Sequence, residues 1–199
     1  MIQSIDPAAC TGCGSCTKTC PLDVFRLETA QEQISPCMAA CPAGVDIRGN
    51  HYLIQQGNLD EAARNYLAVQ PFPAITGRVC FHPCESACAR ARVDSAVNIN
   101  AVEHVLGDWA AQMPLEKPVR RHISKVAVVG SGPAGLSCAW FLALMGYPVT
   151  VFEARPFPGG MLRYGIPAYR LPDDVVATQV RRLEEIGVRF CCNTRVGKG

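Results

Sequence analysis

Residues 126–135 read VAVVGSGPAG, a strand-like apolar run followed directly by a glycine-rich turn and the start of a helix. In this context Gly130 permits a tight turn and Gly132 lets the backbone approach a pyrophosphate, while Gly135 lets the helix pack closely on the strand. The N-terminus of the helix adds oriented N–H groups and partial positive charge. The stretch therefore predicts a Rossmann-type dinucleotide site.

The residues around this turn alternate between strand and helix patterns. We expect strands at 123–129, 148–153 and 188–192, and helices at 133–145 and 172–186. This order predicts a parallel sheet with helical crossovers. Glu153 ends the second strand, 23 residues after Gly130, where an acidic side chain accepts hydrogen bonds from ribose hydroxyls.

A run of 27 uncharged residues, 126–152, is long enough to cross a bilayer. Gly130 and Pro133 interrupt it early, and Gly146 and Pro148 interrupt it late. These breaks divide it into the strands and helix of an α/β core, which are apolar because they are buried inside the protein. We therefore expect no membrane insertion.

The N-terminal cysteines are spaced as Cys10-x2-Cys13-x2-Cys16-x3-Cys20-Pro21. Two-residue gaps let three sulfurs converge on one iron–sulfur cluster, and in two-cluster ferredoxins the fourth cysteine serves the other cluster. The alternatives are a zinc site, which usually takes its ligands as two separated pairs, and a disulfide pair. No apolar export segment follows Met1, so we expect a reducing, cytoplasmic compartment and metal chemistry.

A second cysteine group consists of Cys37-x3-Cys41-Pro42 and Cys80-x3-Cys84-x3-Cys88. Separations of four also place cysteines on one helix face, where they pack as small buried hydrophobes. The flanking prolines and glycine favour loop-presented metal ligands instead. The remaining cysteines have no ligand partners nearby and are interpreted as packing residues: Cys138, Cys191 and Cys192.

The residues between these motifs favour helices. Leu59, Ala63, Tyr66 and Leu67 share one face of an expected helix, and another helix covers 99–111. The prolines within 113–118 indicate a linker. The chain thus divides into a ferredoxin-like segment (1–36), an α-helical iron–sulfur domain (37–118) and a Rossmann-type domain (119–199).

Composition limits the classes of function. Hydrophobic residues make up 49% of the chain and charged residues 18%, which argues against disorder. A formal charge of +2 is too small to indicate nucleic acid as a partner.

Several motifs carry a resemblance to a known family. The stretches CPAGVDI (41–47), PFPA (71–74), GRVC (77–80) and PCE-x2-C (83–88) resemble the N-terminal cluster domain of the glutamate synthase small subunit family, which recurs in dihydropyrimidine dehydrogenase and related NAD(P)H:acceptor flavoproteins. That resemblance implies two [4Fe-4S] clusters between a partner and a flavin.

The glycine-rich half resembles the FAD-binding half of the same family. The matching stretches are 130–136, Glu153-Ala154-Arg155, PGGML (158–162) and RYGIPAYRLP (163–172). NAD(P) is the alternative cofactor, and a surface role is the alternative for Arg155. The expected cofactor-binding residues are Gly130, Gly132, Pro133, Ala134, Gly135, Glu153, Arg155, Gly160, Met161 and Leu162. Met161, Arg163 and Tyr164 are flavin-loop candidates through the resemblance alone, and no catalytic residue is nominated.

The chain departs from the family where ligands are expected. Gln31 and Ile34 lie where relatives often have a Cys-x2-Cys pair, and Thr76 stands where many have a further cysteine. Glu103 lies near the place of a non-cysteine ligand. The candidate metal ligands are Cys10, Cys13, Cys16, Cys20, Cys37, Cys41, Cys80, Cys84, Cys88 and Glu103.

The partition of these ligands stays open. Cys20 or another cysteine of the ferredoxin-like segment completes the clusters of the helical domain, or Cys10, Cys13 and Cys16 share a cluster with Cys41. The ligands suffice for two clusters.

The fold class expected is a multidomain α+β protein with a ferredoxin-like 4Fe-4S segment, an α-helical iron–sulfur domain and a partial Rossmann-type α/β FAD-binding domain. Relatives continue with the rest of the flavin domain and an NAD(P)H unit, so we expect a fragment or a truncated product. The expected function is an FAD and [4Fe-4S] oxidoreductase that serves a redox partner or larger catalytic subunit. Alternatives are a non-catalytic electron relay and an iron–sulfur sensor.

Overall fold

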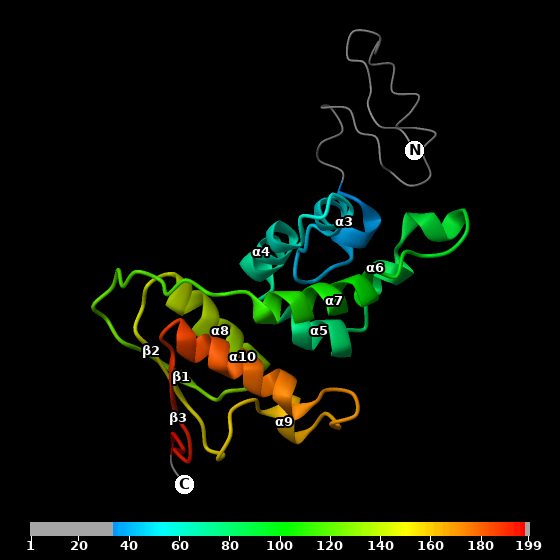
Figure 1. Cartoon of the computed structure of the whole chain (residues 1–199). Coiled ribbons are helices and arrows are strands. Elements are labelled where there is room, and N and C mark those ends of the chain that lie inside the picture. Colours follow the sequence, from blue (N-terminus) through cyan, green and yellow to red (C-terminus); the bar gives the residue numbers. More distant parts are fainter. Residues whose placement is uncertain (1–33, 198–199) are drawn as a thin grey trace.

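The computed structural model describes residues 34–197 (Figure 1). The run from Cys10 to Cys20 lies outside the described residues. The first half of the described chain is helical and consists of α2 (Pro36–Ala39), α3 (Ile47–Gln55), α4 (Leu59–Val69), α5 (Pro73–Val79), α6 (Pro83–Ser86), the short 3-10 helix η2 (Ala89–Arg92) and α7 (Ile99–Gln112). The expected helices at 59–67 and 99–111 are therefore present, and the proline-containing linker separates α7 from the second half.

Helices α5 and α7 cross at close range because each has a glycine at the crossing. A Cβ added to Gly77 would lie 2.5 Å from His104 Cα, and one added to Gly107 would lie 2.4 Å from the carbonyl carbon of Pro73. Arg78 then binds Asp108 through two hydrogen bonds of 2.7 and 3.0 Å. The crossing fixes the relative position of the residues at the end of α5 and those on α7.

The second half alternates strand and helix as expected. It contains β1 (Val126–Val129), α8 (Pro133–Leu144), β2 (Val149–Phe152), α9 (Met161–Tyr164), α10 (Asp173–Glu185) and β3 (Arg189–Cys191). The three strands form a parallel sheet in the order β1-β2-β3. Strand β1 begins three residues later than predicted because its pairing with β2 starts at Val126↔Val149, and Ile123 is exposed.

Helices α8 and α10 pack against each other, and α8 contacts both β1 and β2 (Figure 1). The apolar face of α10 is buried as its spacing predicts, through Val176, Val180 and Leu183. Cys138 is an exception to the sequence interpretation. It was expected to pack in the core, but it lies on the exposed side of α8, whose opposite side holds Leu136, Ala139 and Trp140.

The two halves share one continuous core. The Phe72 ring meets the Trp140 ring of α8 edge-on, with centroids 6.3 Å apart. Arg182 of α10 is 4% exposed, and its Nη1 donates hydrogen bonds to the carbonyl oxygens of Ala111 (3.0 Å) and Met113 (2.7 Å). These contacts join the α/β half to the C-terminal end of α7.

No helix within residues 34–197 is both long enough and apolar enough to span a membrane. The uncharged run 126–152 is divided among β1, α8 and β2, as its glycines and prolines predict.

Candidate iron–sulfur and dinucleotide sites

Four of the predicted metal ligands line one cavity of about 120 Å³, called here the inner cavity: Cys41, Cys80, Cys84 and Glu103. Each comes from a different element. Cys41 follows α2, Cys80 ends α5, Cys84 lies in α6 and Glu103 lies on α7. The prolines at the first positions of α5 and α6 set where these short helices begin, and so where their cysteines lie.

The Glu103 carboxylate is held by two side chains. Oε1 accepts a hydrogen bond from Thr76 Oγ1 at 2.5 Å and another from Gln70 Nε2 at 3.0 Å. Gln70 Nε2 also donates to Thr76 Oγ1. Burial raises the pKa of Glu103, while the hydrogen bond from Thr76 opposes that shift. Both bonds end on Oε1, so Oε2 keeps its lone pairs for a metal.

The side chains of Cys41, Cys80, Cys84 and Glu103 line the inner cavity without converging on one point. Within the described residues, no three His, Cys, Asp or Glu side chains converge closely enough to hold one ion. In a cluster, by contrast, each iron takes its own protein ligand, so the ligands stand around a space. Cys84 is 7% exposed, and burial raises the pKa of its thiol to about 11. Because iron binds the thiolate, metal binding must release that proton.

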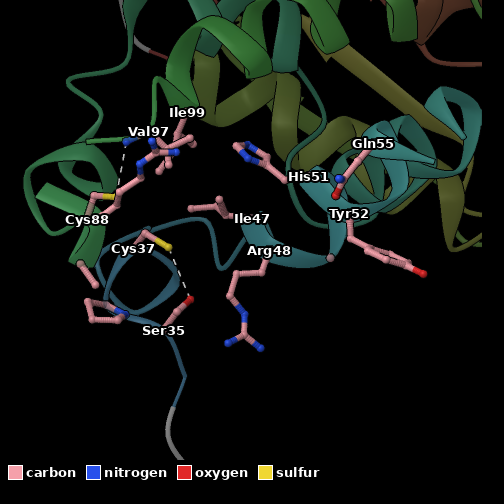
Figure 2. Close-up of a pocket in the computed structure, with 14 residues that line it drawn as sticks. Ser35, Cys37, Ile47, Arg48, His51, Tyr52, Gln55, Cys88, Val97 and Ile99 are labelled. Atoms are coloured by element: carbon pink, nitrogen blue, oxygen red, sulfur yellow. Dashed lines mark hydrogen bonds between the residues drawn. The ribbon is translucent and has the colours of Figure 1, made fainter. Parts of the chain in front are cut away.

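Cys37 and Cys88 line a different depression of about 600 Å³, called here the outer groove. Figure 2 shows both sulfurs on the side of the groove away from Tyr52. Cys37 Sγ lies 3.4 Å from Ser35 Oγ, and Cys88 Sγ accepts a hydrogen bond from the Val97 N–H at 3.5 Å. Of the cysteines in residues 34–197, these two line the groove.

The glycine-rich turn has the geometry that its sequence predicts. Gly130 follows β1 with a φ of +89°. A Cβ on Gly135 would lie 2.0 Å from the Gly130 carbonyl oxygen, so only glycine fits there. A Cβ on Gly132 would meet nothing within 4 Å, which leaves open space beside the N-terminus of α8. Pro133 occupies the first turn of α8, and Ala134 is exposed next to it.

Glu153 is buried and binds the glycine-rich turn. Its Oε2 accepts hydrogen bonds from the Ser131 N–H (2.9 Å) and hydroxyl, and its Oε1 accepts one from the Arg155 N–H at 2.9 Å. Burial alone would raise the pKa of Glu153, but these hydrogen bonds outweigh it and lower the pKa. The carboxylate is therefore ionised and holds the turn. Both lone pairs of Oε2 are used by Ser131, so Oε1 is the oxygen with acceptor capacity for a ribose hydroxyl.

The PGGML loop packs on the same turn. The Gly159 N–H donates to both the carbonyl and the hydroxyl oxygen of Ser131, each at 3.1 Å. A Cβ on Gly160 would lie 2.7 Å from Gly132 Cα, so these two backbones touch. Met161 is exposed beside them, whereas the Leu162 side chain is buried in the core.

Arg155 and Arg163 are engaged with neighbours on the loop. The Arg155 guanidinium stacks over the Tyr164 ring, 4.4 Å from its centroid. Arg163 lies over Phe157 and is 3.6 Å from Asp173. The stacking leaves Arg155 accessible at the rim of the dinucleotide site.

Three residues of these sites were not identified from sequence. Ser131 occupies a variable position of the glycine pattern, and its contacts depend on a loop 28 residues away. Gln70 and Thr76 reach Glu103 across 33 and 27 residues. The only sequence signal of these contacts is Thr76 itself, which stands at a position where a cysteine is expected.

Comparisons with known proteins match the same regions. A protein-family model, described as dihydropyrimidine dehydrogenase domain II, 4Fe-4S cluster, matches residues 29–115. An NAD(P)-binding Rossmann-like domain matches residues 128–177, and a 4Fe-4S binding domain matches residues 1–22.

Curated relatives give the same grouping. The chain is 40% identical over 184 residues to the NADPH-Fe(3+) oxidoreductase subunit beta of Geobacter sulfurreducens. The aligned region covers 89% of this chain and 27% of that protein. It is 37% identical over 167 residues to the NAD-dependent dihydropyrimidine dehydrogenase subunit PreT of Escherichia coli K12, with 82% of this chain and 40% of that protein covered. It is 36% identical over 193 residues to the glutamate synthase [NADPH] small chain of Bacillus subtilis, with 87% of this chain and 39% of that protein covered.

The chain thus spans well under half the length of these relatives. The resemblance to the glutamate synthase small subunit and dihydropyrimidine dehydrogenase proteins is confirmed, as are the 4Fe-4S and Rossmann-like assignments.

Proposed function

We propose that this chain is the cluster-bearing and flavin-binding part of an NAD(P)H oxidoreductase that passes electrons between NAD(P)H, FAD and two [4Fe-4S] clusters to a partner acceptor. The carrying observation is the inner cavity, where three thiols and a half-buried carboxylate, each from a different part of the chain, line one space. The relatives support it, since their names describe subunits or chains of nicotinamide-dependent oxidoreductases.

The inner cavity fits a [4Fe-4S] cluster. Cys41, Cys80 and Cys84 would supply three thiolates, and Glu103 would supply a carboxylate to the fourth iron. This arrangement favours Cys41 as a ligand in the inner cavity over its sharing a cluster with Cys10, Cys13 and Cys16.

The outer groove would supply two of the ligands of a second cluster. Cys37 and Cys88 supply two thiolates, and a cluster needs about four. Ser35 and Pro36 line the groove, so the chain enters it directly from the segment that contains the N-terminal cysteines. We assign the two missing ligands to the run Cys10–Cys20, so that the segment 1–36 and the helical domain 37–118 share this cluster.

The glycine-rich turn of the domain 119–199 would hold FAD. The N–H groups at the N-terminus of α8 would bind the pyrophosphate at the open space beside Gly132, and Glu153 would bind the ribose while it holds Ser131. FAD supplies two-electron chemistry toward the nicotinamide and one-electron chemistry toward the clusters. The Phe72–Trp140 and Arg182 contacts keep the helical and α/β halves in fixed relation, as electron transfer between them requires.

Anaerobic expression of the full chain tests this function. Iron, acid-labile sulfide and released flavin are quantified, and NAD(P)H-to-dye activity is measured on the chain. We expect about eight irons per chain and bound or bindable FAD. Clusters with no affinity for FAD would favour the electron relay instead, and a chain that binds nicotinamide in place of FAD would overturn the flavin assignment.

The shared cluster has its own test. Single substitutions to alanine are compared with the Cys191→Ala control, and iron is counted beside EPR spectra of the reduced proteins. The substituted residues are Cys10, Cys13, Cys16, Cys20 and Cys37. We expect Cys37→Ala and at least one cysteine substitution within 10–20 to lose the same EPR signal. If substitutions in the N-terminal run leave the signal lost in Cys37→Ala intact, the segment does not complete the outer groove.

A further inference from the structure

The hydroxyl of Tyr66 is a buried polar group without a hydrogen-bond partner. Tyr66 lies on α4 and is 1% exposed, and its Oη atom has no partner among the described residues. A buried tyrosine hydroxyl normally has one, since leaving it unpaired destabilises the folded protein. Its helical spacing places Tyr66 on the apolar face of α4, but packing alone does not explain the hydroxyl.

Tyr66 lines the inner cavity together with the four proposed ligands. Two neighbouring donors of that cavity are already used, because Gln70 Nε2 and Thr76 Oγ1 both donate to Glu103 Oε1. Thiolates, sulfides and a carboxylate are all hydrogen-bond acceptors. A loaded inner cavity therefore contains several acceptors beside one uncommitted hydroxyl donor.

A tyrosine hydroxyl carries one donor hydrogen. Tyr66 lines the inner cavity and its Oη has no partner among the described residues, so that hydrogen is available to an acceptor in the cavity.

We propose that the Tyr66 hydroxyl donates a hydrogen bond to a sulfur of the [4Fe-4S] cluster in the inner cavity and thereby raises the reduction potential of that cluster. The inference rests on the proposed function, since it requires a cluster there, and it assigns to Tyr66 the control of one electron-transfer step. Reduction adds one negative charge to the cluster, so a donor stabilises the reduced form more than the oxidised form.

The size of the effect follows from the strength of a hydrogen bond. A net contribution of about 0.5–1.5 kcal/mol to the reduced state changes the one-electron reduction equilibrium by up to about tenfold. Tenfold corresponds to about 59 mV for a one-electron couple. Loss of the hydroxyl should therefore lower the potential of one cluster and leave the other unchanged.

The test compares Tyr66→Phe with wild type and with Tyr147→Phe, in the full chain purified anaerobically. Tyr147 lies between α8 and β2, away from both cysteine groups, so its substitution removes a hydroxyl without touching either. Iron content and EPR-monitored redox titrations are measured for all three proteins. We expect Tyr66→Phe to keep its iron and to show one cluster with an equilibrium shifted toward the oxidised form by up to about tenfold.

An iron-loaded Tyr66→Phe protein with two unchanged potentials would overturn the proposal. A wild-type protein with no cluster in the inner cavity would instead contradict the proposed function, so the two failures are distinct. If Tyr66→Phe does not fold, pulsed EPR of the reduced wild-type protein, reconstituted in H2O and in D2O, replaces it. The His82 N–H donates to Cys80 Sγ at 3.2 Å, so one exchangeable proton coupled to the inner-cavity cluster is expected without Tyr66. A second coupled exchangeable proton supports the Tyr66 donor, and the absence of a second one contradicts it.

Discussion

Thr76 Oγ1 lies 2.5 Å from Glu103 Oε1 and joins the middle of α5 to α7 at the wall of the inner cavity. A threonine thus occupies a position where a further cysteine was expected, and it orients a carboxylate instead of binding metal itself. Gln70 adds a second donor to the same oxygen. The carboxylate that we propose as the oxygen ligand of the inner cavity is therefore oriented by residues from the C-terminal cap of α4 and from α5.

Replacement of Glu103 should remove one ligand without removing the thiolates. In Glu103→Ala the fourth iron has no protein ligand, so we expect the loss of about one to four irons per chain and the appearance of a [3Fe-4S] EPR signal if three irons stay. Glu61→Ala is the matched control, because Glu61 is an exposed acidic residue in the first turn of α4. Iron content and EPR spectra identical to those of wild type would exclude Glu103 as a ligand.

Two glycines of the glycine-rich turn should respond differently to the same substitution. Gly132→Ala adds a methyl group to open space, so the free energy of unfolding should stay within about 0.5 kcal/mol of wild type while FAD affinity falls tenfold or more. Gly135→Ala forces the methyl into the Gly130 carbonyl and should destabilise the fold by about 3 kcal/mol.

Chemical denaturation and flavin fluorescence titration measure the two effects separately. A Gly132→Ala protein with unchanged FAD affinity would show that the cofactor does not approach this backbone.

Arg182 should stabilise the joint between the two halves. Arg182→Met leaves the carbonyl oxygens of Ala111 and Met113 without their donor, so we expect a loss of about 2–5 kcal/mol in the free energy of unfolding. The neighbouring Arg181 is exposed and bonds only Thr178 on its own helix, so Arg181→Met should change stability by less than about 0.5 kcal/mol. Equal effects of the two substitutions, measured by thermal or chemical unfolding, would contradict the assigned role of Arg182.

His51 should make stability depend on pH. Burial lowers the pKa of His51 below its ordinary value of 6.5, and its Nε2 has no hydrogen-bond partner in the described chain. The unfolded chain therefore binds a proton near pH 6.5 while the folded chain does not. Stability should fall as the pH drops from about 6.5 to the lowered pKa, by at most about 1.4 kcal/mol per pH unit.

His51→Phe should flatten this part of the pH profile. His122, which stacks on Tyr147, provides the control, and His122→Phe should leave the profile as it is in wild type. Unfolding midpoints measured between pH 5 and 7.5 compare the three proteins. A wild-type profile as flat as that of His51→Phe would show that His51 titrates alike in the folded and unfolded chain.

Much of the fold follows from local sequence patterns. The helical spacing of Val176, Val180 and Leu183 predicts α10 and its buried face, and the glycine pattern after β1 predicts the tight turn at Gly130. These features depend on residues a few positions apart. For that reason sequence alone locates α4, α7, α8 and α10 to within a few residues.

The grouping of ligands could not be predicted in the same way. The spacing Cys80-x3-Cys84-x3-Cys88 looks uniform, yet Cys80 and Cys84 line the inner cavity while Cys88 lines the outer groove. The separation arises because α6 ends at Ser86, between Cys84 and Cys88, and because α7 brings Glu103 back to Cys80. Such contacts depend on helix packing over tens of residues. The solvent-facing position of Cys138 likewise depends on which side of α8 meets the sheet.

Iron quantitation on Cys84→Ala, with Cys138→Ala as control, tests the central claim most directly. Both substitutions remove one thiol from the full chain, but Cys84 is buried at the inner cavity and Cys138 is exposed on α8. We predict that anaerobically purified Cys84→Ala loses the EPR signal of one cluster and about four irons per chain, whereas Cys138→Ala keeps the wild-type content. Equal iron content in Cys84→Ala and wild type would contradict an iron–sulfur cluster in the inner cavity.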